Sequence, residues 1–170
     1  MAGGNLMKPG PSEISYRGMR FIIMDRPSDA SMPQLIEQFK RANVKDVIRV
    51  CEPSYKTDLL NAAGITVHDW QFDDGSPPPQ EIIDKWFELL QKRYSEDKDC
   101  CFAVHCVAGL GRGPVMVALA LMELGMKYED TIEFVRERRR GAFNQKQLKY
   151  LSSYKARNRL RNKKSNCAII

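Results

Sequence analysis

Long hydrophobic runs are absent from this chain. Its 170 residues contain no apolar stretch approaching the roughly 18–20 residues of a membrane-spanning helix. The segment Met1–Ser12 is rich in glycine and proline and has no apolar core, so we expect no secretory signal there. Residue 2 is alanine, and we therefore expect no N-myristoylation. The composition is that of a soluble globular protein, and the length fits one domain with a sizeable core.

Nothing in the sequence points to an oxidising compartment. The five cysteines are Cys51, Cys100, Cys101, Cys106 and Cys167. Without a secretion signal, such a set suggests a reducing environment and argues against a structural disulfide framework. A redox-active pair among these thiols stays open.

Acidic residues are missing from the C-terminal segment. The chain has a formal net charge of +6, and the basic side chains of this segment alone account for it, so the rest is formally near neutral. These side chains are Lys155, Arg157, Arg159, Arg161, Lys163 and Lys164. We therefore expect a flexible N-terminus (1–15), one folded domain (16–154) and a polybasic tail (155–170).

Apolar runs alternate with helical patterns along the folded part. Strands are predicted at 19–23, 44–50, 65–68 and 100–104, and helices at 32–41, 57–62, after the prolines 77–79, and at 114–124, 128–138 and 144–151. This alternation predicts a single α/β domain with a central, mostly parallel sheet flanked by helices. The helix at 114–124 is apolar all round, so we expect it to be central.

One turn between a strand and a helix carries a thiol, two glycines and an arginine. It runs from His105 through Cys106 to Arg112. Backbone N–H groups of such a turn can converge on an anion at a helix N-terminus, and they favour a thiolate over the thiol. The arginine offers a planar fork that matches two phosphate oxygens. The predicted phosphate-binding residues are Val107, Ala108, Gly109, Leu110, Gly111 and Arg112.

Two alternatives bear on this turn. A cysteine followed by arginine at this spacing can be a buried structural thiol beside a chance arginine, but the strand, glycines and helix start favour a functional loop. The loop does not fix the reaction, because arsenate reductases and dual-specificity, tyrosine and inositide phosphatases share its geometry. An inositide substrate is less favoured, since the loop interior lacks lysine.

A second loop supplies acidic side chains after the third predicted strand. It spans residues 69–75 and contains Asp73 and Asp74, followed by Gly75. A carboxylic acid on a hinged surface loop could swing over the cysteine loop and protonate a departing oxygen. The alternative is that both aspartates are ordinary turn residues before a helix.

With both loops in place, the chain resembles the phosphatases of regenerating liver (PRL), or type IVA protein tyrosine phosphatases, which have a dual-specificity phosphatase-like fold. The resemblance runs from about Tyr16 to the C-terminus. It rests on segments 49–52, 70–75, 105–112, 125–129 and 138–144, and on a basic C-terminus that ends in a prenylation box.

The resemblance implies roles for individual residues and no metal or cofactor. Cys106 would be the nucleophile that forms a phosphocysteine, Arg112 would bind the substrate phosphate, and Asp74 would donate the proton. His105 and Asp73 would support them. Cys51 matches the family cysteine that forms a reversible disulfide with the catalytic one. Without the resemblance, a small core residue at a strand end is the preferred interpretation of Cys51.

Two positions affect what the resemblance can imply. Gln71 stands where the family usually has proline, which leaves the stiffness of the acidic loop open. Gly113 follows the arginine where most phosphatases of this class carry a serine or threonine, whose hydroxyl stabilises the departing thiolate. PRL proteins typically have alanine there, so the hydroxyl is already missing from the family pattern. We therefore predict slow hydrolysis of the phosphocysteine.

The last residues, Cys167–Ile170, match a prenylation box that the upstream basic cluster strengthens, because one lipid alone binds membranes weakly. A solvated helix end or a nuclear-localisation or nucleic-acid patch are the alternatives. We expect prenylation and methylation of Cys167, with the protein at the cytoplasmic face of plasma and endosomal membranes. The sequence does not decide between a farnesyl and a geranylgeranyl lipid.

Two functions from different classes fit these features. One is a slow, redox-regulated phosphatase of phosphoproteins. The other is a binding module for a membrane partner, for which the family suggests a cyclin-M-type magnesium transporter. The family also allows self-association, and no nucleic acid is expected. A further basic cluster, Arg136, Arg138, Arg139 and Arg140, is expected to be mostly a solvated helix end.

Overall fold

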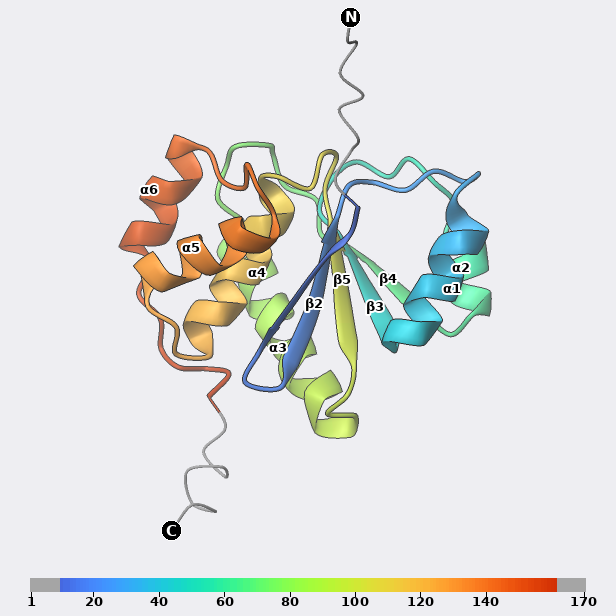
Figure 1. Ribbon diagram of the computed structural model, residues 1–170, viewed down its shortest axis with the longest axis horizontal. Coiled ribbons are helices and arrows are strands. Elements are labelled where there is room, and N and C mark those ends of the chain that lie inside the picture. The colour runs from blue at the N-terminus through green and yellow to red at the C-terminus, as the bar shows by residue number, and fades with distance from the viewer. Residues whose placement is uncertain (1–9, 162–170) are drawn as a thin grey trace, which may run out of the picture.

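The computed structural model describes residues 10–161, which form one α/β domain as predicted (Figure 1). The five strands are β1 (Ser12–Tyr16), β2 (Met19–Met24), β3 (Val44–Arg49), β4 (Thr66–Asp69) and β5 (Cys101–His105). Their order in the sheet is β1-β2-β5-β3-β4; β1 pairs antiparallel with β2, and all other pairs are parallel. Within this range no helix is long and apolar enough to cross a membrane.

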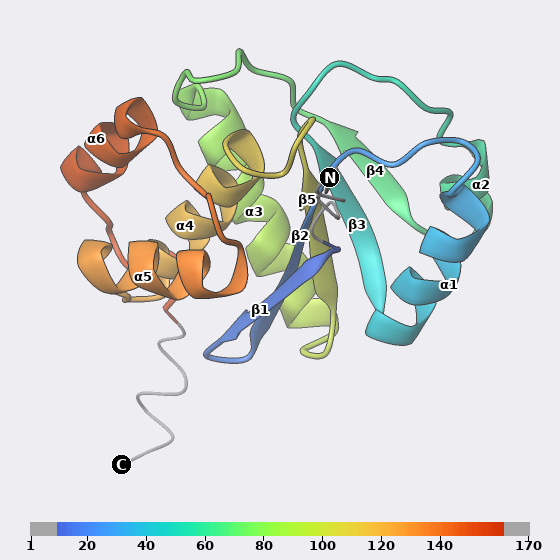
Figure 2. The ribbon, with the colours of Figure 1, turned by 45° about the horizontal axis from the view of Figure 1, so that its top comes forward.

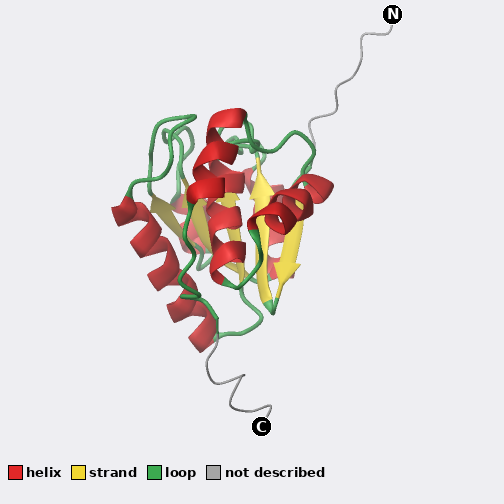
Figure 3. Ribbon diagram, turned by 90° about the vertical axis from the view of Figure 1, so that its left-hand side faces the viewer, coloured by secondary structure: helices red, strands yellow, loops and turns green. Residues whose placement is uncertain are grey.

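Helices cover both faces of the sheet. They are α1 (Met32–Ala42), α2 (Asp58–Ala62), α3 (Gln80–Glu96), α4 (Arg112–Glu123), α5 (Tyr128–Arg138) and α6 (Gln145–Ser153). Helices α1 and α2 lie on one side and the other four on the opposite side (Figure 2). Viewed from the side of α5 and α6, helices stand in front of the strands as a layer (Figure 3).

Successive side chains of a strand point to opposite faces of the sheet, and each face has its own hydrophobic core. On β2, Phe21 and Ile23 join the larger core under α3 and α4, whereas Ile22 and Met24 join the smaller core under α1 and α2. Both sets are buried, as a parallel sheet covered on two faces requires. The Trp86 indole of α3 donates to the Met116 carbonyl of α4 at 2.8 Å, so its polar atom is satisfied inside the larger core.

The central helix is α4, as its apolar sequence predicts. Every one of its residues is buried. It begins at Arg112, two residues before the predicted start at Pro114. The consequence is functional: Arg112 lies in the first helical turn, beside the positive end of the helix dipole.

The ordered body extends further in both directions than predicted. Strand β1 starts at Ser12, inside the segment expected to be flexible, and a turn at Arg17 and Gly18 with φ of 49° and 86° joins it to β2. The sequence did carry a signal for this hairpin, because a two-residue turn that contains glycine, between two short runs of apolar and polar residues, is typical of a hairpin. The missed strand is the sheet's antiparallel edge.

The start of the basic tail is fixed to the body by one buried carboxylate. Glu123, at the end of α4, accepts hydrogen bonds from the backbone N–H groups of Arg157 and Arg159 at 2.8–3.2 Å and from the Tyr154 hydroxyl at 3.0 Å. Leu160 is also buried. The folded part therefore reaches Leu160 rather than residue 154, and Cys167 lies outside the described residues.

Candidate active site

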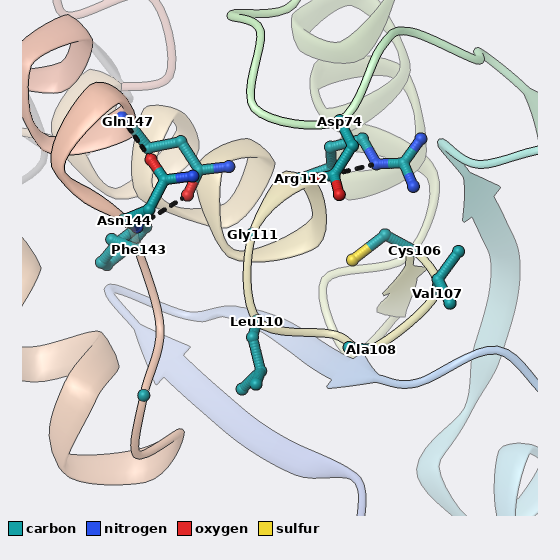
Figure 4. A pocket seen from close by; sticks show the side chains of 11 residues that line it. Asp74, Cys106, Val107, Ala108, Leu110, Gly111, Arg112, Phe143, Asn144 and Gln147 are labelled. Carbon is teal, nitrogen blue, oxygen red and sulfur yellow. Dashed lines mark hydrogen bonds and ion pairs between the residues drawn. The ribbon is translucent and has the colours of Figure 1, made fainter.

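The predicted site residues meet at one edge of the sheet. Because β2, β5, β3 and β4 are parallel, their carboxyl ends lie together, and ligands bind at that edge in open α/β sheets. The cysteine loop (106–111) follows β5, and the acid loop (70–75) follows β4. A cavity of about 330 Å³ lies between them (Figure 4). It is lined by Asp74, Cys106, Val107, Ala108, Leu110, Gly111, Arg112, Gly141, Phe143, Asn144 and Gln147.

Every backbone carbonyl of the cysteine loop accepts a hydrogen bond from outside the cavity or from the loop's own flanks. Cys106 O accepts from the His105 ring and Val107 O from Arg26 N. Arg139 donates to both Ala108 O and Gly109 O. Phe143 N donates to Leu110 O, and Val115 N donates to Gly111 O. In a trans peptide the C=O and the following N–H point in opposite directions. Fixing the carbonyls outward therefore turns the N–H groups toward the cavity, where they can bind an oxyanion.

Arg139 is the main external support of the loop, and the expectation that it is a solvated helix end is wrong. Its side chain is 1% exposed. It donates to Gly109 O at 2.8 Å and to Ala108 O at 3.3 Å, and it also donates to Gly10 O and the Ser12 hydroxyl. A guanidinium suits this place because its donors reach several carbonyls at once.

The two loop glycines are needed for different reasons. Gly109 has φ +71°, and a Cβ there would lie 2.4 Å from Arg139 Nη2 and 2.7 Å from Met24 O. Gly111 has φ −122° and ψ −85°, outside the left-handed region. A Cβ on Gly111 would instead lie 2.8 Å from Gln147 Nε2. Gly109 serves the turn, and Gly111 lets a second side chain approach.

Cys106 lies at the base of the cavity with 3% of its surface exposed. Its Sγ accepts a hydrogen bond from the Gly113 backbone N–H at 3.4 Å. That N–H belongs to the first turn of α4, where the helix carries unpaired donors and partial positive charge. The thiolate is the form of cysteine that attacks phosphorus, and this N–H is placed to donate to it.

Arg112 joins the cysteine loop to the acid loop. Its Nη1 donates to Phe72 O at 3.0 Å and to Val50 O at 3.4 Å, and its Nε lies 3.8 Å from Asp74 Oδ1. Nε is buried and has no hydrogen-bond partner among the described residues. The guanidinium is thus 4% exposed but keeps a donor that an anion in the cavity can use.

The two predicted acids are separated by the structure. Asp74 lines the cavity with a side chain that is 79% exposed, whereas Asp73 does not line it. Gln71, at the position where proline was expected, donates to the Glu52 carboxylate at 3.2 Å, which ties the acid loop to the loop that follows β3. The acid is therefore open to water on one side and placed next to Arg112 on the other.

His105 has a partner that the sequence did not reveal. Its Nδ1 lies 3.2 Å from Cys106 O, which can only accept, so Nδ1 carries the proton and Nε2 accepts from the Tyr55 hydroxyl at 2.6 Å. Burial lowers the pKa of His105 to about 4 and raises the pKa of Tyr55 to about 12. Arg49, paired with Asp69, lies over the Tyr55 ring and holds it.

Cys51 is buried beside this group. Its Sγ lies 3.9 Å from His105 Nδ1, and burial raises the pKa of its thiol against the attraction of Arg112. Cys100 and Cys101 are core thiols, as expected, whose pKa burial raises to about 11 and about 12. Of the described thiols, Cys51 and Cys106 are thus the two at the site.

The sequence also gave no reason to select Gln147. It lies at the third position of α6, where its side chain and that of Asn144 cap the helix reciprocally. It is 2% exposed and lines the cavity. A capping-box pattern was visible in the sequence, but only the tertiary structure brings it against Gly111.

The described residues contain no cluster of side chains suited to hold a metal ion. A thiol at the base of inward N–H groups, an arginine and a facing carboxyl group define the class of cysteine-dependent phosphatases. A family model described as "Polymorphic toxin system, DSP-PTPase phosphatase" matches residues 22–126. A putative protein tyrosine phosphatase from Leishmania major has the same fold, with a TM-score of 0.77 and 39% identity over 86% of this chain and 99% of that chain.

Relatives of near-equal length identify the family. PRL-1 phosphatase of Drosophila melanogaster is 52% identical over 96% of this chain and 94% of its own. Protein tyrosine phosphatase type IVA 3 of Homo sapiens is 49% identical over 96% and 97%. A probable type IVA protein tyrosine phosphatase of Dictyostelium discoideum is 42% identical over the full length of both. The chain belongs to the PRL family of type IVA protein tyrosine phosphatases.

The buried neutral His105 predicts a loss of stability in mild acid. Its folded pKa of about 4 lies below the ordinary value of 6.5, so between these values the unfolded chain binds more protons. The free energy of unfolding should fall as pH decreases from about 6.5 to about 4, by on the order of 3 kcal/mol. Chemical denaturation at a series of pH values measures this slope.

The matched variant is His105→Gln, which keeps a side-chain donor but does not titrate. It should be less stable at neutral pH and show a flatter profile over the same range. An equal slope in the parent and the variant would assign the acid sensitivity to other groups.

Proposed function

We propose that the chain hydrolyses phosphoprotein monoesters in two steps through Cys106. The thiolate attacks phosphorus while the loop N–H groups and Arg112 stabilise the equatorial oxygens, and Asp74 protonates the departing oxygen. The observation that carries this proposal is the set of carbonyls fixed outward around Cys106. Water then cleaves the P–S bond, with Asp74 accepting the proton.

Slow hydrolysis of the phosphocysteine is part of the proposal. Sulfur leaves more easily when a hydroxyl donates to it, but position 113 supplies only its backbone N–H, 3.4 Å from Sγ. A Cβ at Gly113 would lie 3.7 Å from Cys106 Sγ, 3.7 Å from Ile23 Cγ2 and 3.8 Å from Cys106 N, which is ordinary contact. There is therefore space for a serine whose hydroxyl reaches the sulfur.

Gly113→Ser should speed the second step. One hydrogen bond to the leaving thiolate is expected to raise the rate of phosphocysteine hydrolysis by about tenfold, equivalent to roughly 1.4 kcal/mol. Rapid-quench kinetics with an aryl phosphate, followed by intact-mass spectrometry, separates formation of the phosphoenzyme from its decay. Gly113→Ala is the control, since it adds the Cβ without a hydroxyl and should leave the decay near that of the parent. A parent enzyme that releases phosphate as fast as it captures it would contradict this proposal.

A second function is favoured by the same glycine. An enzyme that holds its phosphocysteine for long can act as a binding module whose cavity takes an acidic side chain of a membrane partner, such as a cyclin-M-type magnesium transporter. The cavity suits a carboxylate because it offers inward N–H groups and the free Arg112 Nε. Phosphorylation of Cys106 would block that binding.

Paired variants distinguish the enzyme from the binding module. If partner binding is the main role, Cys106→Ser should lose partner capture. Asp74→Ala should retain it, because the acid serves only the chemistry. The measurement is a pull-down of the transporter's cytosolic domain beside phosphate release by the same proteins. Partner capture that is unchanged in both variants would count against the binding module. Both variants should lose phosphatase activity whichever function is the main one.

Redox control and membrane attachment complete the proposal. Cys51 and Cys106 both lie beside His105, which supports a reversible disulfide that would occupy the nucleophile. The basic side chains from Lys155 onward, together with a prenyl group on Cys167, would bind the anionic cytoplasmic leaflet of plasma and endosomal membranes. Self-association on such a surface is a further proposal that the family suggests.

Cys167→Ser should release the protein from membranes. Membrane fractionation of cells that express the parent and the variant measures this, and Cys100→Ser is the control, because Cys100 is a core thiol. Intact-mass spectrometry of unreduced protein should show the added lipid on the parent and, after peroxide, the loss of two hydrogen atoms for a disulfide. Unchanged fractionation of Cys167→Ser would argue against the anchor.

A further inference from the structure

A buried group of ionisable side chains lies outside the active-site cavity. Asp46 of β3 is 0% exposed. Its carboxylate accepts hydrogen bonds from Arg93 Nε of α3 at 2.8 Å and from His68 Nε2 of β4 at 2.9 Å. Burial opposes the ionisation of Asp46, but these two hydrogen bonds outweigh it and lower the pKa of the carboxyl. Asp46 therefore stays ionised inside the domain.

Stability alone does not account for this cluster. Replacing a buried ion pair by apolar side chains of similar volume is often neutral or stabilising, and in some proteins such groups serve to fix one arrangement of the chain. Here the arrangement concerns β4, which lies at the edge of the sheet and has β3 as its neighbour. The contacts of Asp46 tie this edge strand to the sheet and to α3.

The cluster also fixes the ring of His68. An ionised carboxylate can only accept hydrogen bonds, so Nε2 of His68 carries a proton and faces Asp46. Residues two apart on a strand lie on the same face, and the next residue on this face is Trp70. The ring centroids of His68 and Trp70 are 5.1 Å apart, with an interplanar angle of 42°. Trp70 thus packs against a ring that the buried carboxylate holds in place.

Trp70 is the first residue of the acid loop. Its backbone N–H donates to Arg49 O at 3.0 Å, and its partly buried side chain packs against the larger core. Two residues further on, Arg112 donates to Phe72 O at 3.0 Å, and Asp74 extends from the same loop beside Arg112 (Figure 4). The position of Trp70 sets the direction in which the loop leaves β4, and with it the place that Asp74 reaches.

We infer that His68 is a positioning residue for the proton donor, which holds Trp70 so that the acid loop keeps Asp74 at the cavity. This inference rests on the proposed role of Asp74. In that step the S–P bond forms, the bond from phosphorus to the leaving oxygen breaks, and the proton passes from the Asp74 carboxyl to that oxygen. His68 itself does not line the cavity, so it acts through the loop.

His68→Gln should weaken proton donation, because it keeps a donor for Asp46 but removes the ring that contacts Trp70. Formation of the phosphocysteine should slow by about tenfold with phenyl phosphate, whose basic leaving oxygen needs the proton. With dinitrophenyl phosphate, whose leaving oxygen is weakly basic, the rate should stay within about twofold of the parent. Rapid-quench intact-mass spectrometry of the full chain measures both rates. Thr66→Val, at an exposed position of the same strand, is the matched control and should change neither rate.

His68→Phe tests the other half of the contact. It retains a ring beside Trp70 but has no N–H for Asp46, so the same selective loss is expected to a smaller extent. A smaller folded fraction would lower the rates with both substrates by the same factor. Equal slowing with both substrates in both variants would therefore show a structural role and overturn the inference. Rates unchanged with both substrates would overturn it as well.

Asp74→Ala separates this inference from the proposed function. It removes the proton donor, so the selective loss with phenyl phosphate should be larger, about 100-fold. Without any selective loss in Asp74→Ala, the proposed proton donor is wrong and the inference fails with it. A selective loss in Asp74→Ala but in neither His68 variant would leave the proton donor in place and refute the role of His68 alone.

Discussion

The site depends on one constraint: the carbonyl groups of the cysteine loop must all point outward. Two are tied by donors next to the loop, in His105 and α4, and the other four by donors from the loop after β2, from Arg139 at the end of α5 and from the segment before α6. An unsupported loop of this length would turn some carbonyls inward and repel an anion. Because most of the support comes from elements distant in sequence, folding the whole domain is what creates the oxyanion site.

Two buried arginines have different roles at this site. Arg139 donates from all three of its side-chain nitrogens to backbone carbonyls. Burial lowers the pKa of its guanidinium. Arg112 uses Nη1 on the acid loop, while its Nε lies 3.8 Å from Asp74 Oδ1 and has no hydrogen-bond partner among the described residues. Burying a guanidinium is costly unless its hydrogens are paired. In the proposed reaction a bound phosphate would supply the acceptor that the Nε–H lacks.

Sequence patterns were sufficient to predict the features that depend on neighbouring residues in the chain, such as helices, strands and their buried faces. The alternation of strands and helices predicted the α/β fold, and the apolar helix after Arg112 was correctly expected to be central. Residues whose importance lies in tertiary contacts were not selected. Arg139 looks like one of several solvated arginines, and Tyr55 lies 50 residues from its partner His105. Neither contact has a period or a spacing that a single sequence could reveal.

The same distinction applies to glycine. Both loop glycines are visible in the sequence, but only the structure shows that Gly109 has a positive φ and that Gly111 leaves space for Gln147. The two roles differ in what would follow from adding a methyl group: strain and collision in the first case, and displacement of a single amide in the second. Gly109 is thus required by the turn, and Gly111 by the close packing of the Gln147 side chain.

Gly113 differs from both. It lies in α4 and is not among the residues with positive φ, and an added Cβ meets only ordinary contacts. Within a helix, glycine is less favourable than alanine by about 1 kcal/mol. Neither the backbone nor the available space requires glycine here, so folding does not explain it. Its effect is on the sulfur, whose donor among the described residues is the Gly113 backbone N–H at 3.4 Å. In the proposed reaction a leaving thiolate with so little stabilisation would prolong the phosphorylated state.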